Sequence, residues 1–328
     1  MTSFIPVLRQ IASDRFIWLL LAAVTLALLL PLSANLSGIG SIVSSAGIFL
    51  IFLLHGIRLE RAEVVAGFRN FRLQGAIFGF VFGVMLISGL ALSKVTDNFL
   101  PHDLALGFLF LGVLPSTVQS ATSYCAIAGG NVAASVVASA FINLSGVIIA
   151  PVMFALLASA AGVSITTDAF VRILAILLLP FVIGQLIQRW TRPWVMKNNG
   201  LIGWMDKIVI AMVVYISFSG AIIAGTWFQI EARQFVLLAA ALAVMLAIGF
   251  GGAWTLGGWL YLVRNDRKTL LFSGAQKSIA IGAPLAAILF PPDRAGLILL
   301  PLLIYHLTQL IISAPLALQL AKNDPIAP

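Results

Sequence analysis

The sequence predicts an all-α polytopic membrane protein of about ten transmembrane helices, arranged as two inverted five-helix repeats. Three observations lead to this prediction. The 328 residues are 61% hydrophobic and only 9% charged, a composition that excludes a soluble globular domain. Basic residues alternate between common and rare in successive loops. Similar motifs recur in the same order in the two halves of the chain.

Hydropathy divides the chain into ten apolar segments, and a spanning helix needs about 20 such residues. The first segment follows Arg9 and Arg15 and lacks a small-residue cleavage site, so we expect a helix there and not a removed signal peptide. The expected spans are 17–35, 40–57, 73–93, 104–127, 131–160, 169–189, 205–225, 234–262, 268–290 and 295–320.

The basic residues predict the orientation. Counted on alternate sides of these spans, 14 Lys and Arg lie on one side and 4 on the other, and Lys277 accounts for the last of the 19. The positive-inside rule then places both termini in the cytoplasm of a multi-pass protein of the inner cell membrane, in contact with the lipid bilayer. Because the basic residues form no stripe, nucleic acid is not an expected partner. The single Cys125 excludes an intrachain disulfide.

The two halves, 1–160 and 161–328, carry related motifs. Segment four contains GVLPSTVQSA and segment nine contains LLFSGAQKSIA, and in each half the next segment ends in Ala-Pro. An odd number of segments per half makes the second half enter the membrane from the opposite face, as in many secondary transporters. The alternative is chance recurrence, since Gly and Pro are frequent in membrane helices.

Helix-breaking residues are expected to interrupt segments four and nine. Broken backbone within the membrane is tolerated where it lines a protein-enclosed cavity, and a new helix start there favours an anionic ligand group. The alternative is a pair of kinks that serve packing alone. The candidate break residues are Pro115, Gly129 and Gly130 in segment four, and Gly274, Gly282 and Pro284 in segment nine.

Polar side chains gather around these expected breaks, and Ser135 and Ser139 lie one helical turn apart. Lys277 is the only basic residue within an expected span, where a charge costs at least about 2.5 kcal/mol, so a functional role is the default reading. Snorkelling towards the membrane surface is the alternative. The candidate substrate- and ion-binding residues are Gln119, Ser120, Thr122, Ser123, Ser135, Ser139, Asn143, Ser273, Gln276, Lys277 and Ser278.

The acidic residues argue against several kinds of site. All eleven Asp and Glu lie in expected loops or at span ends, so no carboxylate is expected in the core as a cation ligand or proton relay. His306 alone of the three histidines lies within a span, where a packed, hydrogen-bonded ring is expected. The sequence shows no metal cluster, catalytic triad or phosphate loop, and we expect neither an enzyme nor a bound cofactor.

Three motifs resemble the bile acid:sodium symporter family. They are Pro-x-x-x-x-Ser in segment four, Asn-Val-Ala-x-Ser-Val at the start of segment five and Gly-x-Gln-x-Ser in segment nine. The chain is most similar to the branch with Gln-Lys-Ser in segment nine. The resemblance runs through nearly the whole chain and implies a core domain and a panel domain, with segments four and nine unwound and crossing, a fold shared with cation/proton antiporters. It also implies sodium among segments four, five and nine, and an organic anion beside the crossing.

The resemblance also implies roles for individual residues. Gln119 and Ser120 stand where the family's first sodium site has Ser-Asn, and Ser135 and Ser139 match its hydroxyl ligands. Gln276 matches a glutamine of the second sodium site.

Two positions depart from that pattern. Phe272 stands in place of the glutamate that joins both sodium sites, and Lys277 replaces a neighbouring asparagine. Either the ammonium of Lys277 permanently replaces a sodium ion, or it releases and rebinds a proton during transport. We therefore expect a secondary transporter of a small organic anion, a bile-acid-like molecule or another carboxylate or sulfonate, working by alternating access. The alternatives are a sodium-coupled symporter, a channel, a cation/proton antiporter and a membrane-embedded enzyme.

Overall fold

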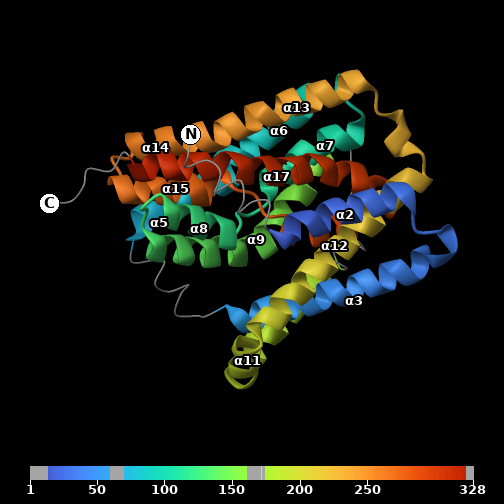
Figure 1. The fold of residues 1–328 in the computed structure, drawn as a ribbon, viewed down its shortest axis with the longest axis horizontal. Helices are drawn as coiled ribbons and strands as arrows, with labels where there is room; N and C mark the ends of the chain where they lie inside the picture. Colours follow the sequence, from blue (N-terminus) through green and yellow to red (C-terminus); the bar gives the residue numbers. More distant parts are fainter. Residues whose placement is uncertain (1–13, 60–69, 161–170, 172–173, 323–328) are drawn as a thin grey trace.

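The structure is a computed structural model that describes residues 14–59, 70–160, 171 and 174–322. These residues form helices and turns and contain no β-strand. The predicted all-α fold is therefore confirmed (Figure 1).

In the first half the helices are α2 (Arg15–Leu29), α3 (Ala34–Arg58), α5 (Phe71–Gly79), the π-helical turn η2 (Phe80–Val84), α6 (Met85–Thr96), α7 (His102–Val113), α8 (Gln119–Ile127) and α9 (Val132–Ala160). In the second half they are η3 (Leu174–Leu178), α11 (Leu179–Lys197), α12 (Asn199–Ile223), η4 (Thr226–Gln229), α13 (Ala232–Ala247), η5 (Ile248–Gly252), α14 (Ala253–Trp259), α15 (Arg264–Ala275), α16 (Ile279–Leu289) and α17 (Pro292–Lys322).

Seven of the helical stretches in the described residues are long and apolar enough to cross a membrane. The other three expected segments are the short helix α2 and two segments that are each divided in two, α7 with α8 and α15 with α16. This agrees with a polytopic protein of about ten segments. The inverted relation between the halves remains a prediction.

Segments three and eight each contain a π-helical turn, η2 and η5. A π turn inserts one residue into a helix and often marks a functional site. Both turns pack against segment nine or ten: a Cβ on Gly274 would lie 2.9 Å from a ring carbon of Phe80, and one on Gly249 would lie 2.8 Å from Tyr305 Oη. Larger side chains at these two glycines would push the helices apart.

The interruptions in segments four and nine differ from the expected residues. Pro115 lies in the stretch between α7 and α8, as expected, but Gly129 and Gly130 follow the end of α8. Gly274 is inside α15, and both Gly282 and Pro284 are inside α16. Close packing explains the glycines, since a Cβ on Gly282 would overlap the side chain of Leu302. The non-helical residues of segment nine are Gln276, Lys277 and Ser278.

The helices pack in two groups. We call α2, α3, η3, α11 and α12 the panel, because α3 packs along η3 and α11, and α2 packs along α12. The remaining helices form the core, and α12 packs along α17 to join the two groups. Figure 1 shows α3, α11 and the first part of α12 diverging from the core.

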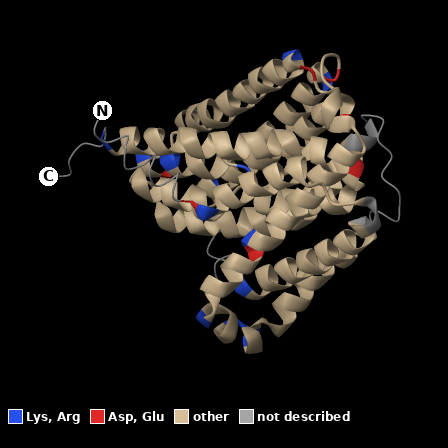
Figure 2. Cartoon of the chain, turned by 45° about the vertical axis from the view of Figure 1, so that its right-hand side comes forward, with Lys and Arg blue, Asp and Glu red and all other residues tan. Residues whose placement is uncertain are grey.

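The contact between α12 and α17 is close at one end. A Cβ on Gly220 of α12 would overlap the backbone of Pro292, and one on Gly296 of α17 would lie 2.7 Å from Ser217 O. Most Lys and Arg lie towards the other end of the molecule, on the left and at the bottom of Figure 2.

Candidate functional site

The two non-helical stretches of segments four and nine meet at one point, which we call the crossing. Leu114, Gln276 and Ser278 all have extended backbone, with ψ of 146°, 149° and 110°. The amide of Ser278 donates a hydrogen bond of 3.0 Å to Pro115 O. The ends of α7 and α15 and the starts of α8 and α16 therefore lie around a single region of unwound backbone.

Lys277 is fully buried at the crossing, with a relative exposure of 0%. Its ammonium donates to three backbone carbonyls: Leu114 O at 2.7 Å, Gly112 O at 3.0 Å and Val81 O at 3.4 Å. All three N–H groups of a charged lysine thus have acceptors. Snorkelling is wrong for this side chain, because its charged end is enclosed by protein.

The position of these carbonyls explains why a charged lysine is buried here. Gly112 and Leu114 lie at the end of α7, where the last carbonyls of a helix lack intrahelical partners and carry the negative end of its dipole. Val81 lies in η2, so the π turn of segment three supplies the third acceptor. A buried cation at this place satisfies backbone groups that the break in segment four leaves open.

The backbone of Lys277 is fixed from α17. Gln309 Oε1 accepts from Lys277 N at 2.7 Å, and Gln309 Nε2 donates to Lys277 O at 3.0 Å. His306 Nδ1 lies 3.2 Å from Lys277 O, and its ring is buried and hydrogen bonded, as expected for a packed histidine. Two residues before Lys277, Ala275 O accepts a hydrogen bond of 2.7 Å from Tyr305 Oη of α17, which caps the end of α15.

Gln276 links the two broken segments to α17. Its Oε1 accepts hydrogen bonds of 2.5 Å from both Thr117 Oγ1 and Ser120 Oγ. Its Nε2 donates to Ser313 Oγ at 3.2 Å. The amide side chain is fully buried, and both lone pairs of its carbonyl oxygen are in use.

A second set of hydroxyls joins segments four, five and nine. Ser135 Oγ lies 3.2 Å from Ser273 Oγ and 3.4 Å from Thr122 Oγ1. Asn143 Nδ2 donates to Ser139 O at 2.8 Å and to Ser116 O at 3.1 Å. These contacts join α9 to segments four and nine at the crossing.

The structure therefore brings most of the sequence-predicted polar residues together, but not all of them. Gln119 and Ser123 are one turn apart on the exposed side of α8 and lie away from the buried contacts. The hydroxyl of Ser139 is buried without a hydrogen-bond partner. Ser278 contributes to the crossing through its backbone N–H and not through its side chain.

Sequence reasoning missed the polar residues of α17. Tyr305, Gln309 and Ser313 repeat every four residues in an otherwise apolar segment, which places them on one helical face. Ser135, Ser139 and Asn143 repeat in the same way in segment five. The second stripe could have been found by searching segment ten for the spacing already recognised in segment five.

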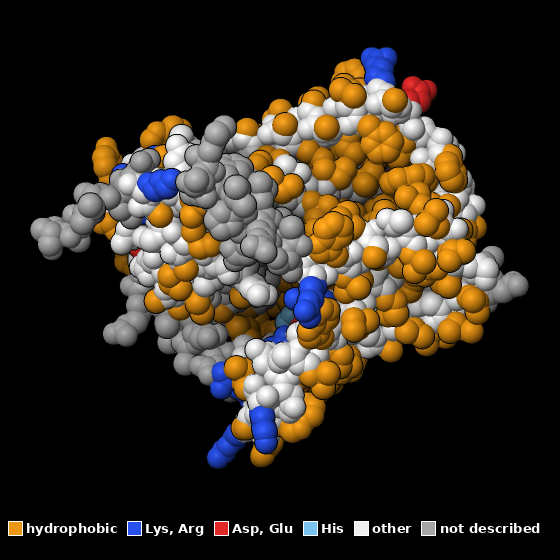
Figure 3. All heavy atoms as spheres, in the orientation of Figure 1, with side chains coloured by type: hydrophobic (Ala, Val, Ile, Leu, Met, Phe, Trp, Pro, Cys, Tyr) orange, Lys and Arg blue, Asp and Glu red, His pale blue; other side chains and the backbone are white. Residues whose placement is uncertain are grey.

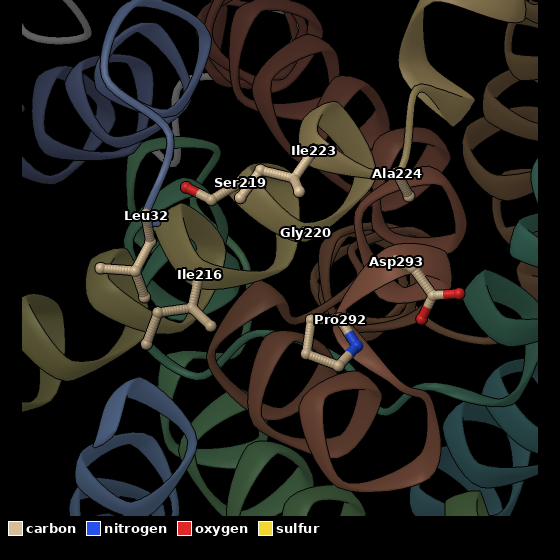
Figure 4. A pocket seen from close by; sticks show the side chains of 8 residues that line it. All are labelled: Leu32, Ile216, Ser219, Gly220, Ile223, Ala224, Pro292 and Asp293. Carbon is tan, nitrogen blue, oxygen red and sulfur yellow. The ribbon is translucent and has the colours of Figure 1, made fainter. Parts of the chain in front are cut away.

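A separate cavity of about 280 Å³ lies between α12 and α17, away from the crossing (Figure 4). Its wall is mainly apolar, and its polar side chains are Ser219 and Asp293. Because a carboxylate repels an anion, this cavity is a poor candidate for an organic-anion site. Among the described residues, no group of three or more His, Cys, Asp or Glu is placed to hold a metal ion.

Comparisons with known proteins identify one transporter family. Residues 14–322 match the model of the SBF-like CPA transporter family. An uncharacterized protein of Pseudomonas aeruginosa is 36% identical over 311 residues, which cover 94% of this chain and 93% of that protein. Escherichia coli K12 has a relative named "Putative symporter YfeH", 33% identical, with 93% and 92% of the two chains covered. The sodium/bile acid cotransporter 7 of Rattus norvegicus is 26% identical, with 84% and 82% covered.

Proposed function

The chain belongs to the SBF-like CPA transporter family, and we propose that it is a secondary transporter that moves a small organic anion by alternating access, with the ammonium of Lys277 in place of a coupling sodium ion. Its membership and its many apolar helices make it a multi-pass membrane transporter and not an enzyme. The substrate class, the coupling and the mechanism are the parts we propose.

The observation that carries the proposal is the coordination of Lys277. Its three acceptors are backbone carbonyl oxygens, which are also the kind of oxygen that binds hard cations. A neutral amine has only two N–H donors, and its lone pair would face the third carbonyl. The geometry therefore supports a permanently charged lysine over one that carries a proton through the transport cycle.

The residues at the family's sodium positions fit a bound cation poorly. The oxygen of Gln276 already accepts two hydroxyl hydrogen bonds, and Phe272 supplies no ligand atom. Gln119 is exposed on α8, whereas Ser135 is hydrogen bonded to Ser273. An ammonium so close to these residues would also repel a second cation in a region of low dielectric.

The packing of the two helix groups supports alternating access. Panel and core are joined by the close contact of α12 and α17, while α3 and α11 diverge from the core (Figure 1). We propose that the end where α12 and α17 are in close contact faces outwards. The opposite end, which is rich in Lys and Arg, would then face the cytoplasm together with both termini. Movement of the crossing against the panel would then expose the substrate to each side in turn.

An organic anion is the substrate class that best fits the charges. The helix starts of α8 and α16 lie at the crossing and present the positive ends of their dipoles. The names of relatives include a symporter and a sodium/bile acid cotransporter, which makes bile salts a sensible first group of test molecules.

The test is uptake of labelled cholate, and of simpler carboxylates and sulfonates, into vesicles that contain the purified protein. Uptake above that of protein-free vesicles, unchanged when sodium is replaced by potassium, is the expected result. Between pH 6 and 8 the uptake should change little. Uptake that requires sodium or a proton gradient would overturn the proposed role of Lys277, and ion currents far faster than carrier turnover would favour a channel.

A further inference from the structure

The first helix begins beside the middle of α17. With 15 residues, α2 is about 22 Å long, shorter than the roughly 30 Å hydrocarbon thickness of a bilayer. Its second residue, Phe16, makes an edge contact with His306, with ring centroids 6.4 Å apart. His306 in turn lies 3.2 Å from Lys277 O. The start of α2 therefore reaches the depth of the crossing, on the panel side.

Two cations lie at this start, on one aromatic ring. Arg15 Cζ is 5.9 Å from the ring centroid of Trp204, and Lys207 Nζ is 5.3 Å from it. Trp204 and Lys207 are three residues apart on α12, so they share a helical face. The sequence assigned Arg15 and Lys207 to cytoplasmic ends of spans, whereas the structure places Arg15 one residue from the contact with His306.

Each of the two nearby carboxylates has a partner on one oxygen, although Asp206 Oδ1 is buried without one. Asp206 forms an ion pair of 2.7 Å with Arg58. Asp14 caps α2 by accepting from Phe16 N at 2.9 Å. In the part of the chain that the structure describes, the Trp204 ring is the one partner of the charged groups of Arg15 and Lys207.

Unpaired cations are costly at membrane depth, and they mark functional sites by default. Arg15 also stands at the positive end of the dipole of α2, where the carboxylate of Asp14 offsets this unfavourable position only in part. Figure 3 shows Lys and Arg side chains in the middle of one face, beside a recess, in the region where Figure 1 shows α2 beginning over α12. A negatively charged ligand would stabilise this arrangement.

The ammonium of Lys277 is not available for this task, because its N–H groups are all used by carbonyls. We propose that Arg15 and Lys207 bind the carboxylate or sulfonate of the transported molecule, with Trp204 and Phe16 against its apolar part. This inference rests on the proposed function and assigns the anion-recognising residues to the panel, while Lys277 maintains the crossing.

An anionic lipid headgroup has the same chemistry as such a substrate. One feature favours a transported molecule: Arg15 directly precedes Phe16, which contacts His306 of the core, and His306 in turn contacts the backbone of Lys277 at the crossing. A headgroup would instead favour basic residues at the level of the bilayer surface.

The experiment measures cholate binding to the purified full chain in neutral detergent, below the micelle concentration of cholate, by the shift in thermal unfolding. The test variant is Arg15→Gln/Lys207→Gln. The matched control is Lys94→Gln/Arg233→Gln, which makes the same charge change at exposed positions outside the proposed site. Uncharged cholate methyl ester and phosphatidylglycerol are tested with each protein.

The wild type and the control should bind cholate equally, and the test variant at least about tenfold more weakly, since bonds to a charged group contribute at least one factor of ten. The uncharged methyl ester should bind the wild type, the control and the test variant equally weakly. If the double variant does not fold, Arg15→Lys, which keeps the charge, should bind cholate and Arg15→Gln should not bind it as tightly.

Equal cholate affinity in the test variant and the wild type would overturn the inference and leave the proposed function standing. Binding of phosphatidylglycerol in place of cholate would assign the cations to a lipid headgroup and would also overturn it. If the wild type neither binds nor transports any organic anion, the proposed function itself fails, and this inference fails with it.

Discussion

Replacing Lys277 with methionine tests the role of its charge with little change in side-chain size. The substitution leaves three backbone carbonyls without this donor: Gly112 O and Leu114 O, now at 3.0 and 2.7 Å, and the more distant Val81 O at 3.4 Å. Hydrogen bonds to a charged group contribute about 1.5–3 kcal/mol each, so loss of the two shorter bonds costs about 3–6 kcal/mol. Removing a buried charge returns about 2.5–3.5 kcal/mol. The net destabilisation should therefore be modest, from about −0.5 to about 3.5 kcal/mol.

Transport should respond much more strongly than stability. The crossing then lacks the cation that joins the end of α7, η2 and segment nine, so we expect uptake by Lys277→Met and Lys277→Ala to fall to background. Lys277→Arg keeps the charge but overfills a fully buried site and should retain partial activity at best.

The assay combines thermal unfolding of each purified variant with vesicle uptake at equal protein content. The thermal measurement separates loss of fold from loss of function. Wild-type uptake by Lys277→Ala, with unchanged sodium response, would refute the assignment of any transport role to this lysine.

Three further substitutions test the packing around the crossing and between panel and core. Gly220→Ala should destabilise the protein by about 1–3 kcal/mol and slow transport, because the new methyl group would overlap the backbone of Pro292. Gly203→Ala on the same helix, with open space around it, is the control, and equal unfolding temperatures would contradict the packing argument. Tyr305→Phe should cost about 1–2 kcal/mol, since it leaves a buried carbonyl unpaired at the end of α15; an unchanged unfolding temperature would show that this cap contributes nothing. Gln276→Leu removes the acceptor of two hydroxyl hydrogen bonds, so the free energy of unfolding should fall by about 1–3 kcal/mol. Wild-type uptake and stability in this variant would argue that Gln276 does not link the broken segments.

The fold could be predicted from the sequence largely because the membrane restricts the possible structures. Apolar segments of sufficient length must be helices, since lipid offers no partners for backbone groups. The sequence also predicted that segment nine is interrupted, but it assigned the break to Gly274, Gly282 and Pro284 and not to the neighbouring Gln276, Lys277 and Ser278. Gly274 and Gly282 permit close packing inside intact helices, and a glycine in a membrane helix does not distinguish packing from a break.

The surroundings of Lys277 could not be derived from the sequence. Its acceptors are backbone carbonyls of Val81, Gly112 and Leu114, and any residue type supplies such an oxygen. The π turn that contributes Val81 O has no clear sequence signal. By contrast, the stripe of Tyr305, Gln309 and Ser313 was readable as a spacing of four.

The position of Arg15 illustrates a further limit of hydropathy. A span is usually drawn from the first apolar residue to the membrane surface, so a basic residue just before it is placed at that surface. The contact of Phe16 with His306 instead places the start of the helix beside the middle of α17. The packing of α2 against α12, together with this contact, reveals it.

The most direct test of the central claim is the effect of sodium on the purified wild-type protein. Ligand binding to the folded state raises the unfolding temperature in a concentration-dependent manner. If the ammonium of Lys277 stands in for the coupling cation, unfolding temperature and cholate uptake should be the same in sodium, potassium and choline chloride at equal ionic strength. A rise in unfolding temperature with sodium alone, accompanied by sodium-dependent uptake, would contradict that claim.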